Sequence, residues 1–307
     1  MAHYQITIKE MAARDGLQNE AINIPTETKV AFINQLSACG LQHIEVSSFV
    51  NPQRIPQLAD AEQVFSQIQR QPGVQYSALV PNVPGLTRAM AVNVDAIAVF
   101  TAASEMFCQR NINCSIEQSL IRFSPMIDQA RQTGLAVRAY VSCVLGCPYE
   151  GYIAPAKVAA LAKQLFDMGC AEISLGDTIG AGTPLQAQQL INEVAEKVPI
   201  EHLAVHFHDT RGQALANILA CLSLGIRVID SAVSGLGGCP YAVGATGNVA
   251  TEDVIYMLHG MGYETGIDLD KLIAAGQYMN SHLQRQNNSR VAVAGVPYDY
   301  ENYKTPQ

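Results

Sequence analysis

The sequence predicts a single (β/α)8 barrel, and three observations lead to this fold class. Eight short runs rich in β-branched residues alternate with longer amphipathic stretches, which is typical of parallel strands joined by helical crossovers. The 307 residues accommodate one such barrel, of about 250 residues, together with an extension. The first turn after a strand lacks a Gly-x-Gly-x-x-Gly pattern, which disfavours an open dinucleotide-binding sheet. No low-complexity segment divides residues 1–307, so we expect one domain.

The eight predicted strands follow one another at similar intervals along the chain. They cover residues 4–9, 43–49, 76–81, 95–101, 137–143, 172–176, 203–208 and 228–234. Amphipathic stretches such as 27–39 and 155–168 lie between them, and both are followed by a glycine that favours a helix end. A further helix is expected over 268–286, so residues from about 265 to 307 are predicted to form a C-terminal helical extension and tail.

Composition excludes several classes of protein. Acidic residues outnumber basic ones by 27 to 19, giving a formal charge of −8, which argues against a nucleic-acid partner. No uninterrupted apolar run approaches the roughly 18 residues that a membrane span needs. The strand-like start leaves no room for a signal or transit peptide, and the eight cysteines lie mostly in apolar segments. These features predict a cytoplasmic protein with mostly buried, reduced thiols.

Polar and charged residues gather where several predicted strands end. Because the active site of such a barrel lies at the C-terminal ends of its strands, these positions are the first candidates. Arg14 and Asp15 follow the first strand, Glu45 lies in the second, and Arg138 lies in the fifth. Arg14 and Asp15 form either a structural ion pair or a site in which the arginine clamps a carboxylate or an enolate oxygen. Arg138 is a similar case, because Glu172 on the neighbouring strand is a suitable partner.

His206 and His208 form the sharpest motif of the sequence. Side chains two residues apart on a strand point to the same face, so the two imidazoles converge. Asp15 is expected to face them across the barrel mouth, because the first strand is only two strands from the seventh. Hydrogen-bonded core histidines are the alternative, but Asp15 and the adjacent Asp209 favour a metal site. A mixed nitrogen and oxygen ligand set suits Mg²⁺ or Mn²⁺ better than a thiolate-type zinc site.

Cys239 differs from the other cysteines in its surroundings. It lies in the run GLGGCPYA, which follows the eighth predicted strand. Glycines permit mobility and close backbone approach, so this loop is suited to carry a thiol to a substrate. The alternative is an ordinary turn with an incidental cysteine.

Four segments carry a resemblance to a known family. They are Arg14–Glu20 (RDGLQNE), Ser174–Gly180 (SLGDTIG), His206–Thr210 (HFHDT) and Gly235–Ala242 (GLGGCPYA). Together they resemble the 3-hydroxy-3-methylglutaryl-CoA lyases, and the resemblance extends from about residue 4 to about residue 285. The Arg-Asp pair and the His-x-His pair are shared with a wider superfamily of metal-dependent barrel lyases and synthases. The Gly-Gly-Cys-Pro loop is much more specific to the lyase branch.

The resemblance implies an activity, which is the cleavage of 3-hydroxy-3-methylglutaryl-CoA to acetyl-CoA and acetoacetate by a homodimer that uses Mg²⁺ or Mn²⁺. The metal ligands that it implies are Asp15, His206, His208 and Asn248. The catalytic residues that it implies are Arg14, Asp15, Glu45, His206 and Cys239, and the substrate contacts are Arg14, Gln18, Ser142 and Thr178. Arg54 and Arg110, in the loops after the second and fourth strands, are candidates for the phosphates of the acyl-CoA.

Several alternatives stay open. A synthase of the same superfamily would join acetyl-CoA to a 2-oxo acid, but the Cys239 loop and the lack of a long C-terminal regulatory extension argue against it. A metal-dependent hydrolase also uses a His-x-His pair, although that pair usually opens the first strand. A barrel that only binds acyl-CoA would not need this full set of reactive groups. A lyase for longer 3-hydroxyglutaryl-CoA analogues is not distinguished by the sequence.

Overall fold

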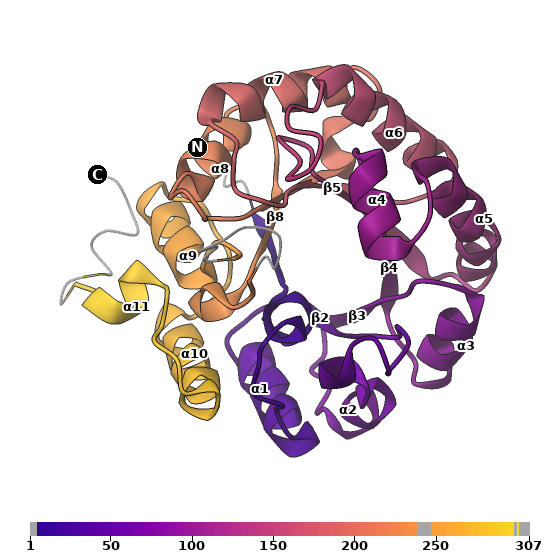
Figure 1. The fold of residues 1–307 in the computed structure, drawn as a ribbon. Helices are drawn as coiled ribbons and strands as arrows, with labels where there is room; N and C mark the ends of the chain where they lie inside the picture. The colour runs from indigo at the N-terminus through magenta and orange to yellow at the C-terminus, as the bar shows by residue number, and fades with distance from the viewer. Residues whose placement is uncertain (1–4, 239–246, 298–299, 301–307) are drawn as a thin grey trace.

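The computed structural model describes residues 5–238, 247–297 and 300. Eight parallel strands close into a barrel in sequence order, and helices surround it (Figure 1). The strands are β1 (Thr7–Glu10), β2 (His43–Ser48), β3 (Gln75–Leu79), β4 (Ala96–Ala102), β5 (Ala136–Ser142), β6 (Glu172–Asp177), β7 (Leu203–Phe207) and β8 (Val228–Ser231). Because β1 pairs with both β2 and β8, the first and last strands close the barrel. The predicted (β/α)8 fold is confirmed.

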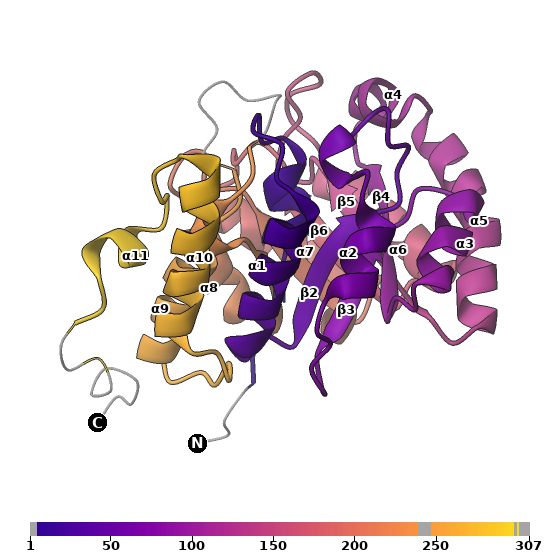
Figure 2. The same cartoon turned by 90° about the horizontal axis from the view of Figure 1, so that it is seen from below.

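The helices form an outer ring and a C-terminal addition. They are α1 (Thr26–Ala38), α2 (Ala61–Gln67), α3 (Val83–Ala91), α4 (Glu105–Ile112), α5 (Ile116–Gln132), α6 (Pro155–Asp167), α7 (Pro184–Ala195), α8 (Ala214–Leu222), α9 (Thr251–Gly260), α10 (Leu269–Leu283) and α11 (Arg290–Ala294). Figures 1 and 2 show α10 beside α1 and α9, with α11 following it on the outside. The predicted extra helix is therefore present. None of the helices in the described ranges is both long and apolar enough to cross a membrane.

Side-chain caps define where several helices begin. Ser104 accepts a hydrogen bond from the backbone of Phe107 at the start of α4. Ser115 and Gln118 form a capping box at the start of α5. Such caps satisfy backbone N–H groups that a helix leaves unpaired, typically stabilising it by about 1 kcal/mol. Since α4 follows β4 directly, its cap fixes a helix at the end of the barrel where the strands terminate (Figure 2).

Alternation along the strands separates an apolar layer from a polar barrel interior. On β7, Val205 and Phe207 are fully buried members of the large apolar core. The residue between them, His206, contacts Asp230 on β8 inside the barrel. Charged side chains therefore line the interior of the barrel near its mouth, where they are available for chemistry.

The observed strands end within two residues of the predicted ends, except β8. β8 ends at Ser231, before the predicted residue 234, because Val233–Gly235 forms a 3₁₀ turn in which Ser234 has a φ of 60°. β1 ends at Glu10, and the chain then forms a π-helical turn over Ala12–Gly16. Single π turns are frequent at functional sites, and this one contains Arg14 and Asp15.

Candidate active site

The predicted functional residues surround one cavity at the barrel mouth, with a volume of about 770 Å³. Eight of them line it, namely Arg14, Asp15, Gln18, Arg54, Ser142, Thr178, His206 and His208, whereas Glu45 and Asn248 are not among the lining residues. Phe107 and Asn111 of α4 form part of its wall. This volume lies within the range of small-molecule and cofactor sites.

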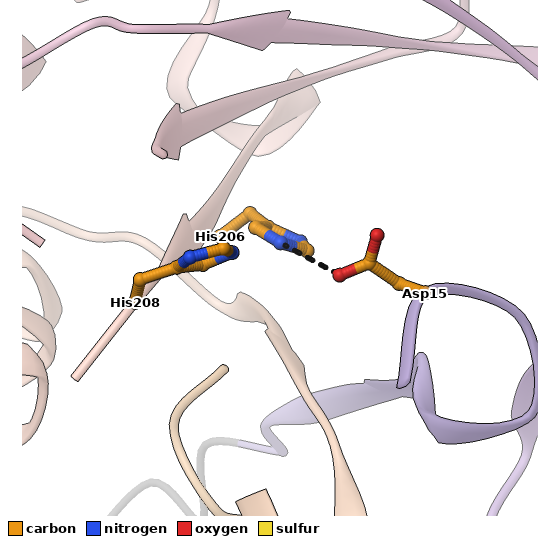
Figure 3. A group of neighbouring side chains, drawn as sticks. All are labelled: Asp15, His206 and His208. Atoms are coloured by element: carbon orange, nitrogen blue, oxygen red, sulfur yellow. Dashed lines mark ion pairs between the residues drawn. The ribbon is translucent and has the colours of Figure 1, made fainter. Parts of the chain in front are cut away.

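Asp15, His206 and His208 form a cluster suited to a metal ion. Each offers one ligand atom, and these atoms all lie within 4.8 Å of one another. Figure 3 shows the two imidazoles on one side and the Asp15 carboxylate facing them from the π-helical turn. His206 Nε2 lies 3.8 Å from Asp15 Oδ2. The structure therefore brings Asp15 together with two histidines that lie far from it in the sequence.

The protonation states of this cluster suit metal binding. Burial raises the pKa of Asp15, but the charges of Arg14 and the two histidines lower it by more. The resulting pKa is about 2, below the ordinary value. Burial and the neighbouring His206 lower the pKa of His208 to about 4. At neutral pH, Asp15 is a carboxylate and His208 is an uncharged imidazole, as metal ligation requires. His208 Nδ1 is buried without a hydrogen-bond partner in the described structure, which fits a site that receives a further ligand.

Asn248 lies beside this cluster rather than on the cavity wall. Its Nδ2 donates to Asp15 Oδ2 at 2.8 Å and to the Leu236 carbonyl at 3.1 Å. Its backbone forms an isolated bridge with His208. Asn248 is 3% exposed, so the amide is fixed next to both Asp15 and His208.

Arg14 is held between two carboxylates. Its Nε donates to Glu45 Oε1, and its Nη1 donates to Asp15 Oδ1 at 2.6 Å. The guanidinium also lies 5.4 Å from the ring centre of Tyr140. Burial lowers the pKa of Arg14, but the charges of Glu45 and Asp15 raise it well above the usual range. Arg14 is therefore a permanent cation at the cavity wall, and both interpretations of the Arg14–Asp15 pair are compatible with this contact.

Tyr140 connects inner side chains of β2 and β5. Its hydroxyl donates to Glu45 Oε2 at 2.6 Å, and it accepts from Arg138 Nη1 at 3.0 Å. It lines the same cavity as Arg14. The sequence signal was its place on the inward face of β5, two residues from Arg138, but no partner could be assigned without the strand register.

Asp230 on β8 is a second residue that the sequence predictions missed. It is 1% exposed and accepts two hydrogen bonds from Arg138, at 2.8 and 2.6 Å. Arg138 also forms the predicted ion pair with Glu172. Burial raises the pKa of Asp230, but Arg138 and His206 lower it well below the usual range. The available signal was the single charged residue of the eighth strand.

The comparisons with known proteins agree with this geometry. The HMGL-like family model matches residues 5–279. The chain belongs to the HMGL-like family. The rat protein named 3-hydroxy-3-methylglutaryl-CoA lyase, cytoplasmic, is 56% identical to it over 94% of this chain and 84% of the rat protein. The bovine protein named hydroxymethylglutaryl-CoA lyase, mitochondrial, is 53% identical over 94% of this chain and 89% of its own length.

Two bacterial relatives of this HMGL-like chain are also informative. A Pseudomonas aeruginosa protein named 3-hydroxy-3-isohexenylglutaryl-CoA/hydroxymethylglutaryl-CoA lyase is 54% identical over 94% of this chain and 97% of that protein. A solved structure of an HMG-CoA lyase from Acinetobacter baumannii, in complex with coenzyme A and 3-methylmalate, superimposes with a TM-score of 0.92. It is 37% identical and covers 97% of this chain and 98% of that one.

Cys239 lies outside the described residues of the HMGL-like chain. The residue before it, Gly238, lines the cavity. The Gly238 carbonyl accepts a hydrogen bond from Asn19 Nδ2 at 3.2 Å. The residue that immediately precedes Cys239 in the chain is therefore part of the cavity wall.

The two arginines predicted to meet CoA phosphates differ in position. Arg54 lines the cavity of the HMGL-like chain, whereas Arg110 is not among the lining residues. The Arg110 guanidinium instead lies 4.2 Å from the ring centre of Tyr149, a distance typical of a cation–π contact. Arg122, which the sequence predictions missed, lines the cavity as well. It precedes Phe123 on the amphipathic helix α5, so its sequence context resembles that of an ordinary surface cation.

Proposed function

We propose that this chain is a hydroxymethylglutaryl-CoA lyase, which cleaves 3-hydroxy-3-methylglutaryl-CoA into acetyl-CoA and acetoacetate. The observation that carries the proposal is the Asp15, His206 and His208 cluster inside a cavity of about 770 Å³. Lyases named for this reaction share more than half of their aligned residues with the chain. The reaction breaks a carbon–carbon bond beside a tertiary alcohol, so it needs a proton acceptor and a group that stabilises an enolate.

A divalent cation, Mg²⁺ or Mn²⁺, fits the donor set of the site. Asp15, His206 and His208 would hold it, with Asn248 as a fourth ligand beside them. Nitrogen and oxygen donors without a thiolate suit these ions. When bound, such an ion orients an oxygen-bearing substrate and makes its hydroxyl group more acidic.

Arg14 supplies the fixed positive charge that the enolate of acetyl-CoA requires. Glu45 and Asp15 hold its guanidinium in place before the substrate arrives, so no reorganisation is needed during the reaction. Glu45 acts here as the carboxylate that positions Arg14, and Tyr140 in turn donates a hydrogen bond to Glu45.

Two proton transfers complete the reaction. The substrate hydroxyl proton passes to the Asp15 carboxylate, which lies next to His206 at the cavity, because the ring nitrogen of His206 that faces Asp15 would hold the ion. The enolate carbon then receives a proton from the Cys239 thiol. The adjacent position of Gly238 on the cavity wall supports this role for Cys239.

The remaining cavity residues bind the substrate. Gln18, Ser142 and Thr178 line it and contact the acyl portion. Arg54 and Arg122 are the cations that meet the phosphates of coenzyme A, because both line the same cavity. The CoA complex of the Acinetobacter baumannii relative supports an acyl-CoA ligand.

We also propose a cytoplasmic homodimer. The seven cysteines in the described ranges are free thiols and all are buried, which supports a reducing compartment. The dimer rests on the resemblance to the family.

The deciding experiment follows acetoacetate and acetyl-CoA formation from 3-hydroxy-3-methylglutaryl-CoA. Purified protein is assayed with a reductant and with Mg²⁺ or Mn²⁺, and a sample treated with a chelator serves as the control. We expect equal amounts of both products with metal and a strong loss of rate without it. If no product forms in the presence of either ion, the lyase assignment is wrong.

A lyase acting on longer 3-hydroxyglutaryl-CoA analogues is the second candidate. The observation in its favour is the double name of the Pseudomonas aeruginosa relative. Leu79, Phe100 and Phe107 also give the cavity an apolar portion. A comparison of kcat/KM for the methyl and isohexenyl substrates decides between the two, since a higher value for the longer substrate would favour the second candidate.

A further inference from the structure

Asp230 is an ionised carboxylate buried directly beneath the candidate metal cluster. Arg138 donates two hydrogen bonds to it, and the Ser174 hydroxyl lies 2.8 Å from its Oδ2. An ionised carboxylate only accepts hydrogen bonds. Any N–H group that contacts it is therefore a donor.

The fourth contact of Asp230 is His206. His206 Nδ1 lies 3.1 Å from Asp230 Oδ2, and the two residues are register partners on β7 and β8. Because Asp230 only accepts, Nδ1 of His206 must carry the proton. The other ring nitrogen, Nε2, then has a free lone pair, and it lies 3.8 Å from Asp15 Oδ2 at the cavity.

We propose that Asp230 is a positioning residue, which fixes the tautomer and ring orientation of His206 so that Nε2 faces the metal site. The inference rests on the metal cluster of the proposed function. Histidines that bind metals commonly donate their other N–H to a carboxylate, and loss of that partner typically costs 10- to 100-fold in metal affinity or activity.

His208 lacks such a partner. Its Nδ1 is buried without a hydrogen bond in the described structure, so the two histidines of one motif are oriented in different ways. His206 is held by a charged network that extends to Arg138, whereas His208 is held by its packing. Metal affinity should therefore depend on Asp230 through His206.

A purely structural role makes a different prediction. Arg138 is held by two carboxylates, Asp230 above it and Glu172 at the lower end of the barrel. If Asp230 served only to pair with Arg138, then removing the charge of Glu172 should have a similar effect. Glu172 has no contact with His206 among the described hydrogen bonds, which makes Glu172→Gln the matched control.

The test compares Asp230→Asn with Glu172→Gln and the unchanged protein. Mn²⁺ binding is measured by titration calorimetry, so the readout does not depend on turnover. We expect Asp230→Asn to weaken Mn²⁺ binding by about 10- to 100-fold and Glu172→Gln to leave it unchanged. Equal losses in both variants, or no loss in Asp230→Asn, would overturn the positioning role.

A second readout separates this inference from the proposed function. Nitrogen-15 NMR of the metal-free protein, labelled at histidine, reports which ring nitrogen carries the proton. The His206 signal is assigned as the one that is absent from the spectrum of the His206→Gln variant. We expect Nδ1–H in the unchanged protein and a mixture of tautomers in Asp230→Asn. If His206 of the unchanged protein carries its proton on Nε2, the inference fails even where Mn²⁺ binds and the lyase is active.

Asp230→Asn removes one of the two carboxylates that pair with the buried Arg138 cation. An incompletely paired buried charge is destabilising, so this variant can fail to fold. The double variant Arg138→Gln with Asp230→Asn removes both charges and keeps hydrogen-bonding groups in place. It still lacks the carboxylate next to His206. We expect it to show the same weakened Mn²⁺ binding and mixed tautomers, and normal values for both would contradict the proposal.

Discussion

Arg14 lines the cavity with its guanidinium fixed by Glu45 and Asp15, so its removal should slow the reaction. In Arg14→Gln we expect kcat to fall by about 10²- to 10³-fold, the usual loss for a removed oxyanion donor. KM should change much less, because the guanidinium acts on charge that develops during the reaction. Steady-state kinetics give this result, and circular dichroism checks that the variant is folded. A loss confined to KM would assign Arg14 to substrate binding alone.

Cys239 follows a cavity-lining glycine and should act in proton transfer. Cys239→Ala is expected to lose about 10²- to 10⁴-fold in kcat, the range of general acid catalysis. Its Mn²⁺ affinity and melting temperature should match the unchanged protein. Cys221→Ala is the control, because Cys221 is a buried thiol of α8 away from the cavity. Full activity in Cys239→Ala would exclude the thiol from the mechanism.

Individual residues differed in how far the sequence could place them. His206, His208 and Asp15 were predictable because strand alternation and barrel closure decide where they point. The contact between Arg14, Glu45 and Tyr140 joins the turn after β1 with β2 and β5, so it depends on a strand register that sequence patterns do not specify. Asp230 was missed because one acid in a short strand has no spacing partner along the chain.

At the scale of elements, two buried acids hold the turns around the site. Glu10 at the end of β1 accepts hydrogen bonds from the backbone of Ala12 and Val233 and from the Thr251 hydroxyl. Glu252 on α9 accepts from the Ser234 backbone. These carboxyl groups connect β1 and α9 with the turn after β8. Burial raises the pKa of Glu10 to about 7 and that of Glu252 to about 8.

The raised pKa of Glu10 gives a pH-dependent prediction. Between its ordinary value of 4.5 and about 7, the unfolded chain has lost the proton that the folded chain keeps. Folding stability therefore falls as the pH rises through this window. Glu10→Gln cannot ionise, so its stability relative to the unchanged protein should improve between pH 5 and pH 8, by roughly 3 kcal/mol at most. Urea unfolding at both pH values measures this, and a constant difference would contradict the assigned pKa.

The elements themselves were largely predictable. All eight strands and the helix at 269–283 lie where hydrophobic patterns indicated. The strand ends were less predictable, because the turn after β8 depends on Ser234 in a left-handed conformation that favours glycine. The π-helical turn over Ala12–Gly16 was also missed. A hydrophobic pattern along the sequence does not show whether the backbone hydrogen bonds of a turn have α-helical or π-helical spacing.

For the whole molecule, ion binding should increase stability. Mn²⁺ at 100 times its dissociation constant should raise the free energy of unfolding by about 2.7 kcal/mol, provided that it binds only the folded state. Removal of the ion with a chelator should lower the melting temperature by a corresponding amount. His208→Ala loses one ligand and should respond weakly to Mn²⁺. An identical Mn²⁺ response in His208→Ala would show that the ion binds elsewhere.

The closure of β1 on β8 also has a consequence for the order of folding. Asp15 follows the first strand and His206 lies on the seventh, so along the chain most of the strands of the barrel come between the two residues of the cluster. These residues approach one another only when the last strand has completed the ring. During synthesis, we therefore expect the proposed ion site to be complete only after β8 has left the ribosome. An ion that binds this cluster would then be captured only by the closed barrel.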